Sequence, residues 1–440
     1  MIQSVEKPDV IVIGGGPSGC ATATILAQRG YRVRVYEREH FPRFHVGESL
    51  IPFCHGTIRR IGMLEKMKSS HFTKKYGVQF INEHGKLSEP FRFEEYDPHE
   101  RSQTWQVLRS EFDHMLMQNA REHGVEVVEG ARVLDIERQG DRVVGVKVKC
   151  GDGPAQVVHS QVVVDASGQS SMLIDRMNMR EWDADLKKAA VWSYFKGAKR
   201  EPGLDSGGTI VIQTQGKKGW FWYIPLHDDV VSVGVVADFD YLFKNRETKD
   251  PEKIFHEEVA RCAGIQPRIA GAECVGEYRI MKEYSYKASQ AAGDGWVLVG
   301  DAFGFLDPLY SSGILLALVS AQMAGDAIAD ALDVNDPSEA RLRAWEPEYR
   351  KAMDRMRNLV RAFYDGLNFA QLVRKHPDKK HLITDILIGN LFKDEVDELW
   401  PLIDALRDEE AAMSSGAMSS GSMSSAAMSS GGKEPMPVGT

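Results

Sequence analysis

Apolar and polar positions along the first forty residues predict a strand, a turn, a helix and a second strand. The short apolar run Asp9–Ile13 predicts a buried strand, and Pro17–Arg29 has helical character. Gly30 stands where a glycine is expected just past a helix end. Arg32–Tyr36 then alternates as a second strand. The chain therefore opens with a βαβ unit.

The rest of the chain predicts further strands and two helical regions. Val78–Phe93 resembles a short hairpin, Ser110–His123 is an amphipathic helix, and 339–407 is all-helical. A buried strand at Trp296–Val299 leads through a glycine-containing turn into a long helix from about Ser312 to Leu332. The remaining predicted strands are the pairs Val125–Val128 and Val143–Val148, then Val162–Asp165, Ala189–Phe195, Thr209–Gln213, Trp220–Ile224 and Val230–Val236.

Composition narrows the classes of partner. With 43% hydrophobic and 27% charged residues, the 440-residue chain matches a soluble globular protein. A net charge of −9 and the absence of a basic stripe argue against a nucleic-acid partner. The five cysteines lack metal-ligand spacing, so we expect no metal site, and the apolar run Val10–Ile13 is too short for a signal or membrane segment. We expect a cytoplasmic protein without a membrane partner.

The last residues differ from the rest of the chain. Met413, Met418, Met423 and Met428 each begin an MSS pentad, and Gly and Ala separate the pentads. Such a tract buries too little apolar surface to offset the entropy of ordering it. Residues 409–440 are therefore expected to form a disordered tail.

The first strand and helix flank a GxGxxG motif at Gly14, Gly16 and Gly19. Gly14 permits the tight turn, Gly16 lets the backbone approach a pyrophosphate, and Gly19 allows the helix to pack closely on the strand. Unpaired N–H groups at the helix start then face the phosphates. Glu37 ends the second strand, where its carboxylate can accept from ribose hydroxyls. These features predict a Rossmann-type dinucleotide site.

Later segments favour FAD over NAD. In DGWVLVGDAFGF, Gly300-Asp301 follows a buried strand, which resembles the second FAD fingerprint of flavoproteins with the glutathione-reductase-like fold. The resemblance implies that Asp301 binds the ribityl chain, Arg109 lies near the cofactor, and Val133 lies near the adenine. A surface ion pair is the alternative for Arg109. The predicted cofactor-binding residues are Gly14, Gly16, Pro17, Ser18, Gly19, Glu37, Arg38, Gly47, Glu48, Ser49, Arg109, Val133, Asp301 and Pro308.

Three further segments resemble flavin-dependent halogenases. Residues 220–225, WFWYIP, fit WxWxIP, and residues 305–313, FLDPLYSSG, fit FxxPxxSxG. The loop at 41–52, FPRFHVGESLIP, is similar to the one that lies along the flavin in these enzymes. The resemblance runs from about residue 8 to 400. An aromatic-rich core strand is the simpler interpretation of WFWYIP taken alone.

The resemblance implies how these residues would act. Reduced FAD and O2 form a C4a-hydroperoxide, which converts chloride or bromide to hypohalous acid. Trp220 and Trp222 would wall the organic substrate away from the peroxide. Ser312 and Gly313, at a helix start that favours anions, would seat the halide, although helix capping by serine fits the same residues. Lys75, within a pattern like FxxKxGxxF, would be catalytic by holding the oxidant.

One position departs from the tryptophan halogenases, which carry a glutamate two residues before the position of Ser312. Tyr310 stands there in this chain. The departure puts indole substrates in doubt and favours a phenol- or pyrrole-like ring, either free or tethered to a carrier protein. The alternatives are a flavin hydroxylase or monooxygenase and a geranylgeranyl-reductase-like FAD oxidoreductase. Without a second GxGxxG unit, a separate flavin reductase would have to supply reduced FAD.

The predicted fold class is α/β with an α+β substrate part. A Rossmann-type FAD-binding domain takes residues 1–180 and 280–335, with 76–105 contributing to the substrate side. A β-rich substrate domain takes 181–279, and a helical C-terminal domain takes 336–408.

Overall fold

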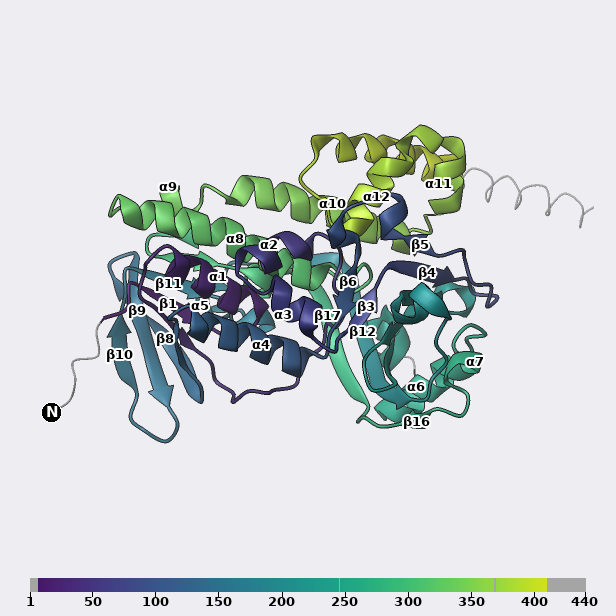
Figure 1. Cartoon of the computed structure of the whole chain (residues 1–440), viewed down its shortest axis with the longest axis horizontal. Helices are drawn as coiled ribbons and strands as arrows, with labels where there is room; N and C mark the ends of the chain where they lie inside the picture. Colours follow the sequence, from purple (N-terminus) through teal and green to yellow (C-terminus); the bar gives the residue numbers. More distant parts are fainter. Residues whose placement is uncertain (1–6, 245, 368, 410–440) are drawn as a thin grey trace, which may run out of the picture.

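A six-stranded sheet forms the core of the N-terminal part of the structure, a computed structural model that describes residues 7–244, 246–367 and 369–409 (Figure 1). All neighbouring strands run parallel except the pair β18 and β19. The central strands are buried on both faces, which explains their unbroken apolar runs. The order is β18 (Ala292–Gly293), β19 (Trp296–Leu298), β11 (Val162–Asp165), β1 (Val10–Ile13), β2 (Val33–Tyr36) and β7 (Glu126–Val128).

Helices and a small second sheet pack on this core. Helix α1 (Pro17–Gln28) contacts α4 (Arg109–Glu122) and α8 (Ser312–Asp333). The three-stranded sheet contacts β2 and β11 and consists of β8 (Ala131–Gln139), β9 (Arg142–Cys150) and β10 (Gln156–His159). The shorter helices of this part are α2 (Cys54–Arg60), α3 (Leu64–Ser69) and α5 (Met172–Arg176).

The predicted strands at 125–128 and 143–148 do not pair with each other. Strand β7 pairs with β2 in the parallel sheet, whereas β9 pairs with β8 and β10. The sequence prediction missed β8, because most of its residues are only partly buried and its sequence, ARVLDIERQ, lacks a clear apolar alternation.

A nine-stranded sheet forms the second part of the molecule. Its order is β20 (Gly304–Phe305), β17 (Arg279–Ala288), β12 (Arg180–Lys196), β15 (Val230–Asp238), β14 (Gly219–Pro225), β13 (Thr209–Gln213), β4 (Gly77–Ile81) and β5 (Phe91–Arg92), with β16 (Glu273–Cys274) beside β12. Helix α6 (Pro251–Ala260) packs on β12 and β15, and α7 (Gln266–Ile269) follows it. Strands β4 and β5, from within 76–105, pair as a hairpin and join this sheet.

The predicted boundary at residue 280 needs correction. Strand β17 pairs with β12 along most of its length, so residues up to Ala288 belong to the nine-stranded sheet rather than to the part built on the parallel sheet. Strand β12 also begins at Arg180 and not at Ala189. Both errors arise because the polar residues at the start of β12 and in β17 conceal the strand pattern.

Strand β14 places its side chains alternately in two cores. Phe221 and Tyr223 pack into a cluster with α6, while Trp220 and Trp222 pack into the large cluster shared with the parallel sheet. The period-2 alternation therefore turns both indoles toward the part of the molecule built on the parallel sheet.

Two smaller units complete the fold. Strands β3 (Thr73–Lys75) and β6 (Thr104–Gln106) form a two-stranded sheet. The C-terminal helices lie together along one side of the molecule (Figure 1) and are α9 (Glu339–Leu342), α10 (Glu346–Tyr364), α11 (Phe369–Lys375) and α12 (Lys380–Ile388). The predicted disordered tail lies outside the described residues, apart from its first residue.

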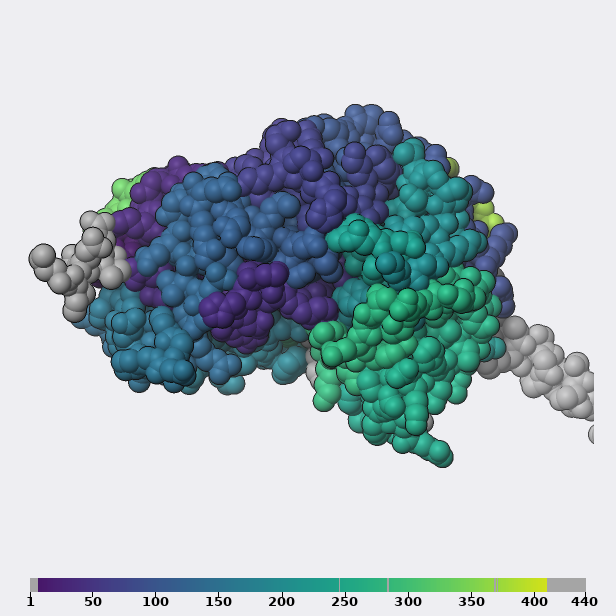
Figure 2. Space-filling model, turned by 60° about the horizontal axis from the view of Figure 1, so that its bottom comes forward, coloured from purple at the N-terminus to yellow at the C-terminus, as the bar shows by residue number. Residues whose placement is uncertain are grey.

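One helix and one surface view complete the description of the fold. Among the described residues, α8 is long and apolar enough to cross a membrane by length and composition, but 61% of its most apolar window is buried inside the fold. A space-filling view shows a purple segment, from within the first fifty residues, beside the junction of the blue part and the teal and green part (Figure 2).

Candidate functional site

The turn after β1 requires its glycines. Gly14 has φ +100°, and a Cβ there would lie 2.5 Å from the carbonyl oxygen of Ala166 on the neighbouring strand connection. A Cβ on Gly19 would lie 2.0 Å from the carbonyl oxygen of Gly14. Neither position has room for a Cβ, so only glycine fits at either one. The absence of these side chains lets α1 pack directly on the turn. Its free N–H groups then face the cavity in front of β1.

Glu37 and Arg43 line the same cavity beside this turn. Glu37 accepts the N–H of Gly15 at 2.8 Å and the N–H of Glu39 at 3.0 Å. The Arg43 guanidinium lies 3.7 Å from the Glu37 carboxylate and 3.2 Å from that of Asp113. Arg43 was not predicted from the sequence, because a single arginine in a loop belongs to no motif. Its position near Gly16 suits a phosphate group.

A cavity of about 450 Å³ runs from this turn to the nine-stranded sheet. Most of the predicted site residues line it, and these are Gly14, Gly16, Pro17, Ser18, Glu37, Arg38, Gly47, Glu48, Ser49, Arg109, Val133, Trp220, Trp222, Asp301, Pro308 and Gly313. Three predicted residues do not line it. Gly19 lies behind the turn, and Ser312 and Lys75 are buried in the walls.

Arg109 joins the loop of residues 41–52 to α4. It forms a bidentate ion pair with Asp113 at 2.7 and 2.9 Å, and its Nη1 donates to the carbonyl oxygens of Val46 and Gly47 at 2.7 and 3.3 Å. Gly47 has φ +99°, and a Cβ there would meet Arg109 at 3.2 Å. The arginine is 5% exposed, so the ion pair is buried and not the surface pair considered as its alternative.

Two carboxyl groups face the cavity, and neither is in contact with a cationic side chain among the residues that the structure describes. Burial raises the pKa of Asp301 to about 6, with Arg109 opposing the change. Burial likewise raises the pKa of Glu48 to about 6, although its Oε1 accepts from the Tyr194 hydroxyl at 2.7 Å. Its Oε2 has no hydrogen-bond partner among the described residues. Both acceptors suit a ligand that brings hydroxyl or N–H donors, as a flavin dinucleotide does.

Trp220 and Trp222 form one wall of the cavity, with ring centroids 6.4 Å apart. Trp220 Nε1 donates to Tyr364 Oη at 3.0 Å, and Trp222 Nε1 donates to Ser232 Oγ at 3.1 Å. Gly234 lies opposite Trp222 in the β14–β15 pair, and a Cβ there would come within 2.2 Å of the indole ring. The wall is therefore held by both hydrogen bonds and packing.

Tyr364 extends this network to the loop before α8. Its hydroxyl donates to Asp307 Oδ2 at 3.0 Å. Burial raises the pKa of Asp307 to about 6, opposed by the Leu309 N–H and by Tyr364. Asp307 also lines the cavity, so helix α10 is connected to the site through Tyr364 and Trp220. Tyr364 and Asp307 were not predicted as site residues, because they lie far apart in the chain.

Lys75, the last residue of β3, is completely buried against the loop of residues 41–52. Its Nζ donates to Ser49 Oγ at 2.8 Å and to the carbonyl oxygen of Leu50 at 3.1 Å. Ser49 also contacts Thr209 Oγ1 at 3.0 Å, and both hydroxyl-bearing residues line the cavity. Desolvation lowers the pKa of Lys75 to about 7. The amine therefore lies one hydroxyl group behind the cavity wall, whereas the neighbouring Lys74 is exposed.

Helix α8 starts at the far end of the cavity. Ser311, with φ +56°, precedes its first residue, and the Ser311 side chain does not cap the free N–H groups. Gly313 lines the cavity, and a Cβ there would meet no atom within 4 Å. Ser312 is 1% exposed and lies in the wall. Tyr310 is buried against Phe363 and Phe369, and no described residue bonds its hydroxyl.

Comparisons with known proteins show the family to which this chain is similar. A sequence profile described as tryptophan halogenase matches residues 9–106 and 84–370. A 1H-pyrrole-2-carbonyl-(peptidyl-carrier protein) brominase from Pseudoalteromonas luteoviolacea is 36% identical over 76% of this chain and 80% of its own length. The corresponding chlorinase from Pseudomonas fluorescens is 30% identical over 92% of this chain and 94% of its own. The solved structure of flavin-dependent brominase Bmp2 is 30% identical, covers 93% of this chain and 100% of its own, and has a TM-score of 0.81.

Proposed function

Because this chain belongs to the tryptophan halogenase family and is a flavin-dependent halogenase, we propose that it halogenates a phenol- or pyrrole-like ring at the cavity bounded by Trp220 and Trp222. Lys75 is the catalytic amine of this proposal. Reduced FAD comes from a separate flavin reductase, chloride or bromide is the halogen source, and the reaction takes place in the cytoplasm. The hydroxylase and the geranylgeranyl-reductase-like alternatives are set aside, since the relatives are halogenases.

The observation that carries the proposal is the buried amine behind Ser49. Lys75 reaches the cavity wall through a 2.8 Å hydrogen bond to a residue that itself lines the cavity. Burying an amine is unfavourable unless it has a function or strong partners, and Lys75 has no carboxylate partner among the described residues. A pKa near 7 lets the amine both donate and accept a proton at neutral pH.

Other residues hold the cofactor and the halide in this proposal. Gly14, Gly16 and Arg43 face the pyrophosphate, and Glu37 accepts from the ribose. Asp301, which lines the cavity after β19, accepts from the ribityl hydroxyls. Bound reduced FAD would supply the electrons that activate dioxygen and thereby oxidise the halide.

The start of α8 seats the halide. Its uncapped N–H groups at Ser312 and Gly313 face the cavity end, where a helix N-terminus favours an anion by about 0.3–1 kcal/mol or more. Pro308 shapes the turn before the helix. The indoles of Trp220 and Trp222 separate the organic substrate from the cofactor, and the oxidised halogen is delivered at the Ser49–Lys75 wall.

The substrate class follows from Tyr310 and from the relatives. Tyr310 replaces the carboxylate of tryptophan halogenases, so no general base stands at that position for an indole substrate. A phenol or pyrrole needs less assistance, because its oxygen or nitrogen supplies electron density to the ring. Two relatives are named for a pyrrole carried by a peptidyl-carrier protein, which supports a free or carrier-tethered ring as the substrate of this chain.

The test compares Lys75→Met with Lys74→Met, its exposed neighbour. Each protein receives reduced FAD, oxygen and bromide or chloride with a panel of phenols and pyrroles, free and carrier-bound. We expect Lys75→Met to lose product formation by roughly 100-fold or more while oxidising reduced FAD at the wild-type rate. Lys74→Met should match wild type. Equal halogenation by Lys75→Met would refute the role of Lys75, and an oxygenated product formed without halide would favour a hydroxylase.

A further inference from the structure

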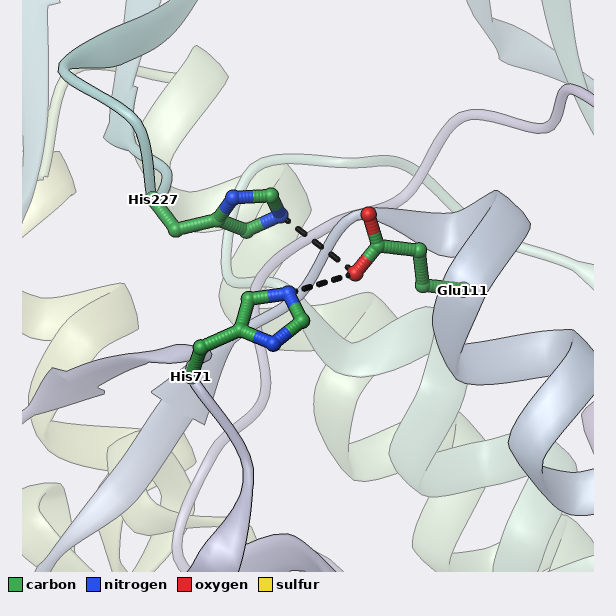
Figure 3. A group of neighbouring side chains, drawn as sticks. All are labelled: His71, Glu111 and His227. Atoms are coloured by element: carbon green, nitrogen blue, oxygen red, sulfur yellow. Dashed lines mark hydrogen bonds and ion pairs between the residues drawn. The ribbon is translucent and has the colours of Figure 1, made fainter.

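Two histidines and a glutamate from three separate segments meet at the junction of the two parts of the molecule (Figure 3). His71 lies in the loop before β3, Glu111 in the first turn of α4, and His227 in the turn between β14 and β15. The ligand atoms of the three side chains all lie within 4.8 Å of one another. None of the three residues lines the cavity described above.

The two imidazoles converge on one carboxylate oxygen. His71 Nε2 lies 2.7 Å and His227 Nε2 3.5 Å from Glu111 Oε2, as Figure 3 shows. The imidazole rings meet edge to face, with centroids 4.4 Å apart. Zinc binds imidazole nitrogens and carboxylate oxygens at about 2.0–2.2 Å, which places neighbouring ligand atoms about 3–3.5 Å apart. The 3.5 Å separation of His227 Nε2 and Glu111 Oε2 matches this spacing, whereas His71 Nε2 and Glu111 Oε2 share a hydrogen bond of 2.7 Å that a bound metal would replace.

His227 provides a second, independent observation. Its Nε2 is buried and has no hydrogen-bond partner among the described residues, although it points toward the carboxylate. Its Nδ1 lies 2.9 Å from Asp228 Oδ2. Metal-bound histidines commonly donate their second ring nitrogen to a carboxylate, which fixes the tautomer that leaves the first nitrogen free for the metal. His227 is therefore arranged as a ligand with its supporting carboxylate already in place.

We propose that His71, Glu111 and His227 bind a divalent zinc ion, with solvent completing the coordination. The expectation of no metal site rested on cysteine spacing, whereas this site uses histidines that are 156 residues apart and contains no thiol. Imidazole and carboxylate ligands suit zinc better than calcium or magnesium, which prefer oxygen ligands alone. The exposed side chain of His71, at 66%, leaves room for solvent.

The bound ion would connect three elements of the halogenation site. His71 lies four residues before Lys75, and Glu111 lies two residues after Arg109. His227 lies in the turn that follows β14, the strand that carries Trp220 and Trp222. The ion would therefore tie the nine-stranded sheet to α4 and to β3. The inference is independent of the proposed function, because binding is measured without FAD, halide or substrate.

The test uses the untagged full-length protein after chelator treatment. Zinc affinity is measured by competition with a chromogenic chelator, and visible absorption is recorded with Co²⁺ in place of zinc. The variants are Glu111→Gln and His71→Ala, with His84→Ala as the control because His84 is an exposed histidine outside the cluster. Circular dichroism checks that each variant is folded before any metal is added.

We expect one zinc ion per chain, a rise in melting temperature on zinc addition, and a Co²⁺ spectrum without thiolate charge-transfer bands. Glu111→Gln and His71→Ala should each raise the dissociation constant at least tenfold and abolish the rise in melting temperature. His84→Ala should behave as wild type. Three outcomes would each overturn the proposal: zinc binding that does not saturate, cluster variants that bind zinc as tightly as wild type, or a Co²⁺ spectrum with thiolate bands.

Discussion

Replacing Lys75 by methionine should stabilise the protein at neutral pH even though it removes activity. The Lys75 side chain is 0% exposed, and burial lowers its pKa from 10.5 to about 7. Since a tenfold change in proton affinity is about 1.4 kcal/mol, this burial destabilises the folded state by roughly 5 kcal/mol below pH 7. Methionine has a similar length and no charge, so it removes this penalty.

The substitution also removes two hydrogen bonds. Ser49 Oγ keeps its contact with Thr209, but the carbonyl oxygen of Leu50 loses the Lys75 donor. An unsatisfied buried acceptor costs about 1–3 kcal/mol. The net gain in the free energy of unfolding is therefore about 2–4 kcal/mol below pH 7.

The pH dependence gives this prediction its sharpest test. Between pH 7 and 10.5 the unfolded chain keeps the Lys75 proton while the folded protein does not, so the stability of wild type rises by up to about 1.4 kcal/mol per pH unit. The methionine variant lacks this rise. Its advantage in urea unfolding should therefore shrink by roughly 2 kcal/mol between about pH 7 and about pH 8.5.

Lys74→Met is the matched control, since Lys74 is exposed and its removal should leave the pH dependence of unfolding unchanged. A Lys75→Met protein that is less stable than wild type at every pH, or whose difference from wild type does not change with pH, would refute the argument that the amine is held in a strongly desolvated site.

Three further predictions follow from single contacts. Gly19→Ala should weaken FAD binding by at least about tenfold in a flavin fluorescence titration, because its Cβ would lie 2.0 Å from the Gly14 carbonyl oxygen and would displace α1 from the phosphate turn. Gly234→Ala should lower the ratio of halogenated product to reduced FAD consumed, because its Cβ would lie 2.2 Å from the Trp222 ring and shift that wall. Tyr310→Phe should raise the free energy of urea unfolding by about 1–3 kcal/mol, because it removes a buried hydroxyl that no described residue bonds.

Each of these predictions has a control or a contrary outcome. Gly56→Ala serves both glycine variants, because a Cβ at Gly56 in α2 meets no atom within 4 Å. Unchanged FAD affinity in Gly19→Ala, or an unchanged product ratio in Gly234→Ala, would show that the backbone absorbs the added methyl group. A less stable Tyr310→Phe would show that the hydroxyl has a stabilising partner.

Features that depend on a few neighbouring residues were predicted well. The opening βαβ unit, the glycine turn and helix α8 follow from local apolar pattern and from turn chemistry. In the structure, both indoles of WFWYIP lie on one face of β14, as the alternation of side chains along a strand requires. Strand β8 and the start of β12 were missed, because partly exposed strands carry little apolar signal.

The sequence by itself thus determined the dinucleotide turn, the order of the main elements and the motifs that resemble those of halogenases. Each of these features is contained within a short segment of the chain, so neighbouring residues are enough to define it. Only the tertiary structure decided that Lys75 is buried behind Ser49, that Arg43 faces the phosphate turn, and that two distant histidines meet at Glu111. The reason is physical: the distance between remote segments is set by how sheets and helices pack, and residue spacing along the chain does not encode it.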